Sequence, residues 1–138
     1  MVVRVPVEVR YIDKSLATST LVNSGYEADE PEIHLPLSFI QRLGIKHEEA
    51  ISERYKVVGA EVSTRILGYV EVRMNLEGKT AGWIKTRAVM VPGEYEVIIS
   101  DALAEELGII VVKPKKGLWK LYGEELERGS VKPQYWIE

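Results

Sequence analysis

A short apolar segment that ends in Leu21 and Val22 leads directly into Asn23, Ser24 and Gly25. All three of these residue types favour turns, so an ordinary turn after a strand is one interpretation of the stretch. A catalytic interpretation would depend on the side chain of Asn23. An amide forms hydrogen bonds but has no proton to give or take near neutral pH, so the turn lacks the acid–base group that a carboxylate would supply.

Acidic side chains crowd the loop that follows this turn. Glu27, Asp29, Glu30 and Glu32 are close together, and His34 comes just beyond them. Their oxygens could hold a hard cation, but the spacing does not match an EF-hand and histidine is a poor ligand for such ions. We therefore predict a solvated acidic loop and no metal site. If the protein binds a ligand near the turn, this loop favours a basic one.

Other kinds of catalytic or cofactor site find no support. The 138 residues include no cysteine, which excludes disulfides, thiolate zinc sites and a cysteine nucleophile. His34 and His47 are too few for the usual zinc ligand sets. Neither a nucleophile elbow nor a phosphate loop occurs, so no cofactor is expected. Trp83, Trp119 and Trp136 are predicted to be core or interface anchors.

The overall charge and hydropathy exclude further classes. The formal net charge is −3, so no nucleic-acid partner is expected. The basic run Lys113, Lys115 and Lys116 is interpreted as a solvated turn. No apolar run approaches the roughly 20 residues of a membrane span. Charges interleave the first ten residues, which argues against a signal peptide. We expect a cytoplasmic protein that has no contact with a membrane.

The elements that would position the turn are mostly strands. Residues 3–10 alternate valines with Arg4, Glu8 and Arg10, which is typical of a half-buried strand. Pro6 cannot donate to a ladder, so this strand should lie at an edge or pair on one side there. Further strands are predicted at 16–22, 54–58, 61–75, 80–91, 108–113 and 117–122, with hairpins around Gly59 and around residues 115–117.

Two segments, residues 32–45 and 96–109, share one pattern: a glutamate, an apolar strand, a short helix and then Leu-Gly-Ile. Each helix has one apolar stripe. Pro36 suits a first helical turn, Ser100 or Asp101 suits an N-cap, and Gly44 and Gly108 suit helix ends. The offset of 64 residues indicates either coincidence between two common units or an internal duplication. A duplication would give halves of about 1–64 and 65–122 with a tail, 123–138.

The apolar strand running into Asn23-Ser24-Gly25 and the later strand–helix unit together resemble the retropepsin-like aspartic peptidases, the family of retroviral proteases and their relatives. The resemblance covers roughly residues 3–122. The stretch from Val22 to Pro36 is similar to a small group of archaeal relatives that have Asn at this position. The resemblance implies a single mostly β domain, a closed or half barrel with pseudo-two-fold halves and two short helices.

The resemblance assigns roles to particular residues. Asn23 stands where the catalytic Asp would be, Ser24 stands at the hydroxyl that cross-links two active-site turns, and Gly25 permits the turn. Ile98 and Ile99 match the strand that supports the turn, whereas Ser100 and Asp101 match the family pattern poorly. The hairpin around Gly59 takes the position of a flap. By position, Glu27 and Asp29 would border the ligand groove.

The same resemblance implies a homodimer, because the family mechanism needs two carboxylates and each chain carries one turn. Two asparagines cannot share a proton, so we predict lost or very weak hydrolysis and retained binding of a peptide or protein segment. The chain termini, including Val3, Val5 and Trp136, are dimer candidates unless they pack on their own subunit. Two alternatives stay open: an active aspartic endopeptidase, and a swapped-hairpin DNA-binding module suggested by residues 32–45.

Overall fold

A computed structural model describes residues 2–23, 25–46, 51–57, 60–79 and 81–137, with the backbone alone from 51 to 63. Ser24 and Gly59, two of the predicted site residues, and His47 lie outside the described residues. The helices are α1 (Leu37–Leu43) and α2 (Asp101–Glu106). The strands are β1 (Val3–Tyr11), β2 (Lys14–Val22), β3 (Glu32–His34), β4 (Ile51–Val57), β5 (Ala60–Met74), β6 (Ile84–Met90), β7 (Ile98–Ile99), β8 (Ile109–Lys113) and β9 (Leu118–Leu121).

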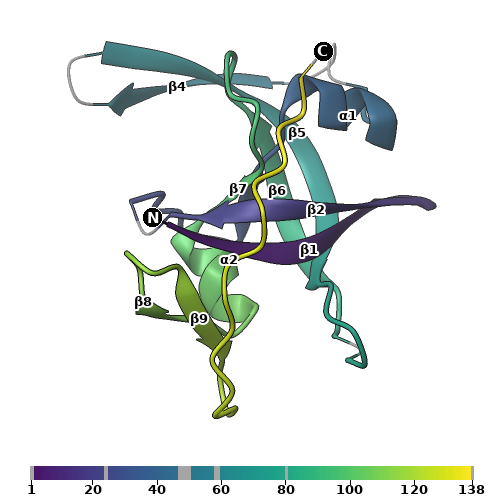
Figure 1. Cartoon of the computed structure of the whole chain (residues 1–138). Helices are drawn as coiled ribbons and strands as arrows, with labels where there is room; N and C mark the ends of the chain where they lie inside the picture. The colour runs from purple at the N-terminus through teal and green to yellow at the C-terminus, as the bar shows by residue number, and fades with distance from the viewer. Residues whose placement is uncertain (1, 24, 47–50, 58–59, 80, 138) are drawn as a thin grey trace.

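Six of these strands close into a barrel of mixed pairing (Figure 1). The order is β1-β2-β7-β3-β6-β5, and β5 returns to β1 by antiparallel pairing. The pairs β2–β7 and β3–β6 are parallel, and the remaining neighbours are antiparallel. β4 pairs with β5 and extends the sheet beyond the barrel. The predicted mostly β domain with a closed barrel and two short helices is confirmed.

β1 forms because its alternating pattern matches the two-residue period of a strand. Its valines point into the barrel, and each is at most 2% exposed. Pro6 pairs with Ser19 of β2, but the pairing with β5 starts only at Val7. The Pro6 carbonyl then accepts a hydrogen bond from the Asn75 backbone N–H at 3.0 Å. The proline therefore sits where β1 needs no second ladder donor, as its missing N–H requires.

Both helices lie where their sequences predict, although Pro36 precedes the first turn of α1 instead of lying in it. Pro36 occupies the N-cap position of α1, and Ser100 caps α2 by accepting from the Leu103 backbone N–H. Gly44 and Gly108 adopt φ values of 83° and 79°, the left-handed conformation that ends a helix and that glycine takes without strain. The caps fix where each short helix starts and stops, and this directs its apolar side toward the barrel.

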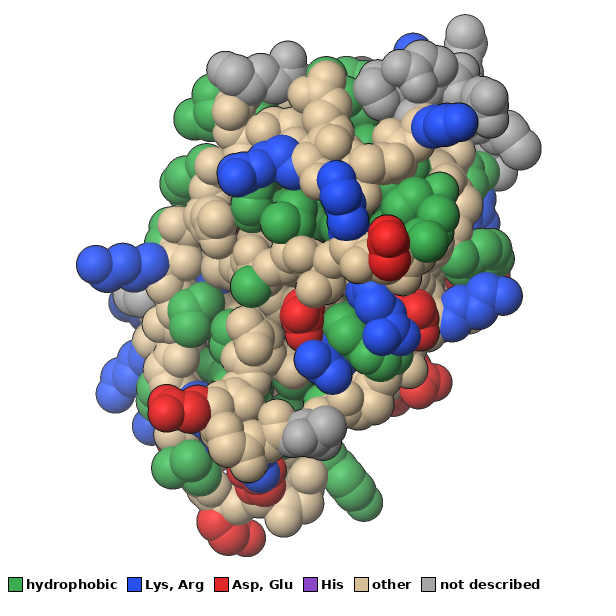
Figure 2. All heavy atoms as spheres, turned by 90° about the vertical axis from the view of Figure 1, so that its right-hand side faces the viewer, with side chains coloured by type: hydrophobic (Ala, Val, Ile, Leu, Met, Phe, Trp, Pro, Cys, Tyr) green, Lys and Arg blue, Asp and Glu red, His purple; other side chains and the backbone are tan. Residues whose placement is uncertain are grey.

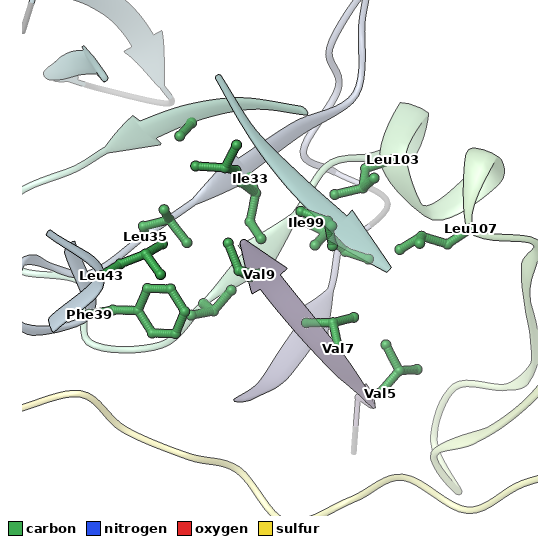
Figure 3. Close-up of a cluster of buried hydrophobic side chains, with 14 of the residues drawn as sticks. Val5, Val7, Val9, Ile33, Leu35, Phe39, Leu43, Ile99, Leu103 and Leu107 are labelled. Atoms are coloured by element: carbon green, nitrogen blue, oxygen red, sulfur yellow. The ribbon is translucent and has the colours of Figure 1, made fainter. Parts of the chain in front are cut away.

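The core lies inside the barrel, and the two helices close it from opposite sides (Figure 3). Phe39 and Leu43 of α1 approach the β1 valines from one side, and both side chains are buried. Leu103 of α2 and Leu107, the residue directly after this helix, approach from the other side, beside Ile99. The short helices are therefore held by tertiary packing rather than by their own propensity.

Several strand boundaries differ from their predictions, and the largest difference is at the start of β6. β6 begins at Ile84 rather than near residue 80. Just before it, Trp83 packs against two guanidinium groups, those of Arg10 and Arg73, which lie 4.1 and 4.2 Å from its ring centroid. Cation–π contact therefore holds this half-buried tryptophan at the junction of β1, β5 and β6. On the face shown in Figure 2, acidic and basic side chains are intermixed around small hydrophobic patches.

The C-terminal segment, residues 123–137, crosses the outside of the barrel over β1 and β2 (Figure 1). The Val131 N–H donates to the Arg4 carbonyl at 3.0 Å, and the Trp136 N–H donates to the Tyr95 carbonyl at 2.7 Å. Trp136 itself is only 7% exposed. The tail thus packs on its own subunit through Trp136, and Val3 and Val5 are buried in their own barrel. These three dimer candidates are therefore already buried by contacts within one chain.

Candidate functional site

The turn that contains Asn23 starts where β2 ends, and β2 lies between β1 and β7 in the sheet. Val22, the last residue of β2, lies beside Ile99 of β7 in a parallel pair. Ile99 in turn lies opposite Ile33 of β3 in an antiparallel pair. The predicted supporting strand therefore lies directly beside β2. Because β7 is flanked by β2 and β3, the position of the turn is fixed by three strands of the barrel.

Hydrogen bonds inside the turn occupy the oxygens of Asn23. Its side-chain Oδ1 accepts from the Gly25 backbone N–H at 3.0 Å, and its carbonyl accepts from the Tyr26 N–H at 3.0 Å. A Cβ atom on Gly25 would lie 3.3 Å from the Asn23 Oδ1, so a larger residue would crowd the amide. Asn23 is exposed to solvent. The structure therefore places Asn23 and Gly25 in one hydrogen-bonded turn.

Ser100 ties the far end of the acidic loop to the start of α2. Its Oγ accepts from the Leu103 N–H at 3.2 Å and from the Glu32 N–H at 3.0 Å. The Ser100 N–H donates to the Glu32 carbonyl at 3.0 Å. Ser100 is fully buried. One hydroxyl therefore caps a helix and anchors the loop that contains the candidate site.

We expect Ser100→Ala to lower the free energy of unfolding by about 1–3 kcal/mol. The substitution removes a helix cap and leaves two buried N–H groups without their acceptor. Urea unfolding followed by circular dichroism measures the change. Ser15→Ala, at an exposed position of β2, is the control and should stay within about 0.5 kcal/mol of the original chain. Equal effects of the two substitutions would contradict the anchoring role.

Asp101 is the site residue that the sequence analysis missed. Its Oδ1 accepts from the Ala28 N–H at 3.0 Å and from the Ala102 N–H at 2.7 Å, while its own N–H donates to the Tyr26 carbonyl at 2.9 Å. It therefore holds the middle of the acidic loop against α2. The available signal was an aspartate directly after a capping serine, a position where its charge also favours the helix.

Two pockets meet at Asp101. The first, of about 400 Å³, is lined by residues that include Asn23, Asp101, Glu105, Ile110, Val111 and Tyr122. The second, of about 520 Å³, is lined by Glu27, Asp29, Glu30, Glu32, Arg87 and Asp101, together with Ala28. Glu27 and Asp29 therefore share one pocket, and Asn23 lines its neighbour. Among the residues that the structure describes, no His, Asp or Glu cluster suits a metal ion.

The acidic loop is less solvated than its composition predicts. Glu32 is only 7% exposed; its Oε2 accepts from the Tyr26 hydroxyl at 2.7 Å and its Oε1 lies 3.6 Å from the Arg87 Nε. Glu30 accepts from the Tyr69 hydroxyl at 2.9 Å. The interpretation of a fully solvated loop is therefore wrong for Glu32, because a buried carboxylate needs such partners. Glu27 and Asp29 are exposed, as expected.

His34 is buried beside this loop and lies against two backbone carbonyls. Its Nδ1 lies 3.1 Å from the Glu96 carbonyl oxygen and its Nε2 lies 3.4 Å from the Val91 carbonyl oxygen. Burial lowers the pKa of His34 below its ordinary value, although both carbonyls oppose that shift. A neutral imidazole carries one N–H and so donates to only one of these two carbonyls, through which it connects β3 to the segment between β6 and β7.

The lowered pKa of His34 predicts that acid destabilises the fold. Because the unfolded chain binds the proton more tightly, the free energy of unfolding should fall as the pH drops below about 6.5, down to the folded pKa. Urea unfolding at pH 7.5 and pH 5.5 tests this. The pH dependence should be smaller for His34→Gln. An equal dependence in both chains would assign it to other groups.

A scan against protein-family models and a search of curated proteins find no match. A search of solved structures finds a similar chain, described as EIAV protease complexed with the inhibitor HBY-793. The match has a TM-score of 0.57 and 18% sequence identity, and covers 82% of this chain and 94% of that chain. The chain has the fold of a retroviral protease. The resemblance seen in the sequence is thus confirmed for the retropepsin-like fold.

Two predicted features of this retropepsin-like chain can be placed only in part. β4 and β5 pair as an antiparallel backbone element, but Gly59, which lies between them in the sequence, is outside the described residues, as is Ser24. No helix among the described residues is long and apolar enough to cross a membrane.

Proposed function

We propose that this protein is a retropepsin-like domain without ordinary aspartic peptidase activity, which binds an extended peptide in a cleft between two copies of the chain. The observation that carries the proposal is the amide of Asn23 at the end of β2, bonded to the Gly25 N–H. In the retropepsin-like arrangement this position would hold the catalytic carboxylate. Asn23, Ser24 and Gly25 would then form a degenerate active-site turn.

The chemistry of the Asn23 amide supports a site that does not hydrolyse peptides. Peptide hydrolysis by an aspartic peptidase needs two carboxylates that share one proton, one acting as base toward water and the other as acid toward the carbonyl. Two copies of Asn23 have no such proton. They could still hydrogen-bond to each other, and they avoid placing two negative charges side by side. Asparagine in place of the catalytic aspartate thus removes catalysis while it leaves the turn intact.

The second pocket, which is lined mostly by glutamates and aspartates, supports a basic peptide as ligand. Glu27 and Asp29 are exposed and line the pocket that shares Asp101 with the pocket of Asn23, and Arg87 is the basic residue among the described residues of its lining. An extended peptide could bind by adding a strand to neighbouring backbone and could place basic side chains in this pocket. The β4–β5 hairpin is proposed to close over it as a flap, together with Gly59.

We also propose that the barrel consists of two related halves, about 1–64 and 65–122, followed by the tail 123–138. His34 pairs antiparallel with Ile98, the residue 64 positions later, as a two-fold axis between the halves would require. In the same way β1 pairs with β5, and the barrel order is unchanged when β1, β2 and β3 exchange with β5, β6 and β7. We further propose a cytoplasmic location, which the lack of cysteine favours.

One observation favours the alternative of an active endopeptidase. Asp101 lines the same pocket as Asn23, so a carboxylate is present near the turn. Its Oδ1 already accepts two backbone N–H groups, which suits anchoring the loop more than proton transfer. The other alternative, a swapped-hairpin DNA-binding module, gains nothing from a closed six-stranded barrel with a net charge of −3.

A paired binding and cleavage assay tests the proposal. Basic and acidic peptides of equal length, and a statine-type peptide mimic, would be titrated into the chain while cleavage is followed by mass spectrometry. We expect saturable binding with a preference for the basic peptide and no cleavage between pH 4 and pH 7.5. Glu27→Lys with Asp29→Lys should abolish the preference. Cleavage by the chain as it stands would favour the active alternative, and a lack of binding would contradict the proposed cleft.

A further inference from the structure

One tyrosine on the outer face of β5 reaches the acidic loop. Tyr69 is 49% exposed, and its hydroxyl donates to the Glu30 Oε1 at 2.9 Å across 39 positions of the chain. Tyr69 lies opposite Arg87 of β6, and Arg87 lies opposite Glu32 of β3. The hydrogen bond therefore joins β5 to the loop before β3, although β6 lies between the two strands.

The carboxylates that line the second pocket differ in what already holds them. Glu32 has the Arg87 guanidinium beside it, with Oε1 3.6 Å from Nε. The half-buried Glu30 instead accepts from Tyr69, an uncharged donor. The hydrogen bond to Glu30 raises the pKa of Tyr69 above its ordinary value, so the hydroxyl stays protonated at neutral pH. Such a donor orients the Glu30 carboxylate and leaves its negative charge available to a cation.

The ring of the same tyrosine holds a lysine. The Lys85 Nζ lies 4.4 Å from the Tyr69 ring centroid, within the range of a cation–π contact. Lysine has a flexible four-carbon stem, so an ammonium released from the ring could swing toward the carboxylates of the pocket. There it would compete with the basic group of a ligand. Tyr69 therefore fixes one carboxylate and restrains one competing cation.

We infer that Tyr69 is a positioning residue that sets the preference of the second pocket for a basic ligand group. The ligand group is the ammonium or guanidinium of a peptide side chain, which the Glu30 carboxylate would bind. Tyr69 acts through Glu30 and Lys85 and need not touch the ligand. This inference rests on the proposed function, because it requires a peptide in the pocket.

A double-mutant cycle, read by isothermal titration calorimetry, tests the role of the hydroxyl. Tyr69→Phe keeps the ring and should raise the Kd of the basic peptide by about three- to tenfold, while the Kd of the acidic peptide stays the same. In a chain that carries Glu30→Gln, Tyr69→Phe should have little further effect, because the charge through which it acts is gone. Tyr95→Phe, at a tyrosine that is 47% exposed, is the matched control and should leave both constants unchanged.

A second pair of variants tests the ring. Tyr69→Leu removes the ring together with the hydroxyl, so it should weaken binding of the basic peptide more than Tyr69→Phe does. Adding Lys85→Met to Tyr69→Leu should recover part of the loss, because the competing ammonium is then absent. A lack of recovery would overturn the role given to Lys85.

The outcomes separate this inference from the proposed function. A loss of affinity for the basic peptide that disappears in the Glu30→Gln chain would support the role of Tyr69. If the original chain prefers the basic peptide, but Tyr69→Phe has no effect or has the same effect with and without Glu30→Gln, the inference is wrong and the proposed function stands. If the original chain binds neither peptide, the proposed function fails and the inference fails with it.

Discussion

Asn23→Asp is expected to give a chain that cleaves peptides, whereas the proposed function predicts no cleavage by the original chain. The substitution supplies each copy with a carboxylate at the end of β2, where the Asn23 Oδ1 now accepts from the Gly25 N–H. Two carboxylates that meet in a dimer share one proton, so one acts as acid and the other as base. A positioned acid–base group contributes about 10²–10⁴-fold to a rate. Cleavage of unfolded protein substrates should therefore rise at least a hundredfold above the original chain.

Two control variants distinguish cleavage at the Asn23 turn from cleavage by a contaminating peptidase or by Asp101. Asn23→Ala is the matched control, which should remain as inactive as the original chain. Asp101→Asn, introduced into the original chain, tests whether that carboxylate supports any residual cleavage. The activity of Asn23→Asp should be lost at alkaline pH, when both carboxylates ionise. If the original chain and Asn23→Asp cleave equally, Asn23 does not occupy the catalytic position.

Trp136→Ala is expected to lower the free energy of unfolding by about 3–5 kcal/mol, the range for removal of a large buried aromatic side chain. The indole lies edge-on to Phe39 with ring centroids 4.8 Å apart, and its Nε1 donates to the Thr18 hydroxyl at 3.0 Å. The Arg42 guanidinium lies 5.4 Å from the ring centroid. One residue near the C-terminus thus joins α1, β2 and the tail.

Urea unfolding at two protein concentrations measures this effect and shows where the tail binds. Ile137→Ala is the matched control, because Ile137 is 70% exposed. This substitution should change the free energy of unfolding by no more than about 0.5 kcal/mol. If the tail packs on its own subunit, the loss caused by Trp136→Ala will be the same at both concentrations. A loss below about 1 kcal/mol would contradict the packing of Trp136.

The sequence predicted local features well, because local rules govern them. The valine alternation identified β1, and glycines and Ser100 identified the helix ends, since side-chain period and backbone conformation depend on neighbouring residues alone. The closure of the barrel was harder to see. The β2–β7 and β3–β6 pairs each join segments more than 50 residues apart, and the fold was reached through resemblance rather than through periodicity.

Of the candidate site, the sequence indicated only the residues between Asn23 and Asp29. Asn23, Gly25, Glu27 and Asp29 are near neighbours in the chain, so their shared location was visible in the sequence. The role of Asp101 depends on a hydrogen bond to Ala28 that spans 73 residues, and the local signal, an aspartate directly after a capping serine, does not identify that partner. The burial of Glu32 likewise depends on Arg87 from another strand. The binding of the tail to the chain's own barrel also depends on such distant contacts, notably between Trp136 and Thr18.

The central claim is that two copies of the Asn23 turn meet across a two-fold axis, and disulfide trapping tests it most directly. The chain has no cysteine, so Asn23→Cys introduces a single thiol. A disulfide forms without distortion only when the two Cα atoms lie about 4.4–6.8 Å apart. We predict rapid conversion of Asn23→Cys to a covalent dimer under mild oxidation, while Glu125→Cys, on the exposed tail, remains monomeric. Equal cross-linking of both variants, or none of Asn23→Cys at concentrations where the chain is dimeric, would contradict the claim.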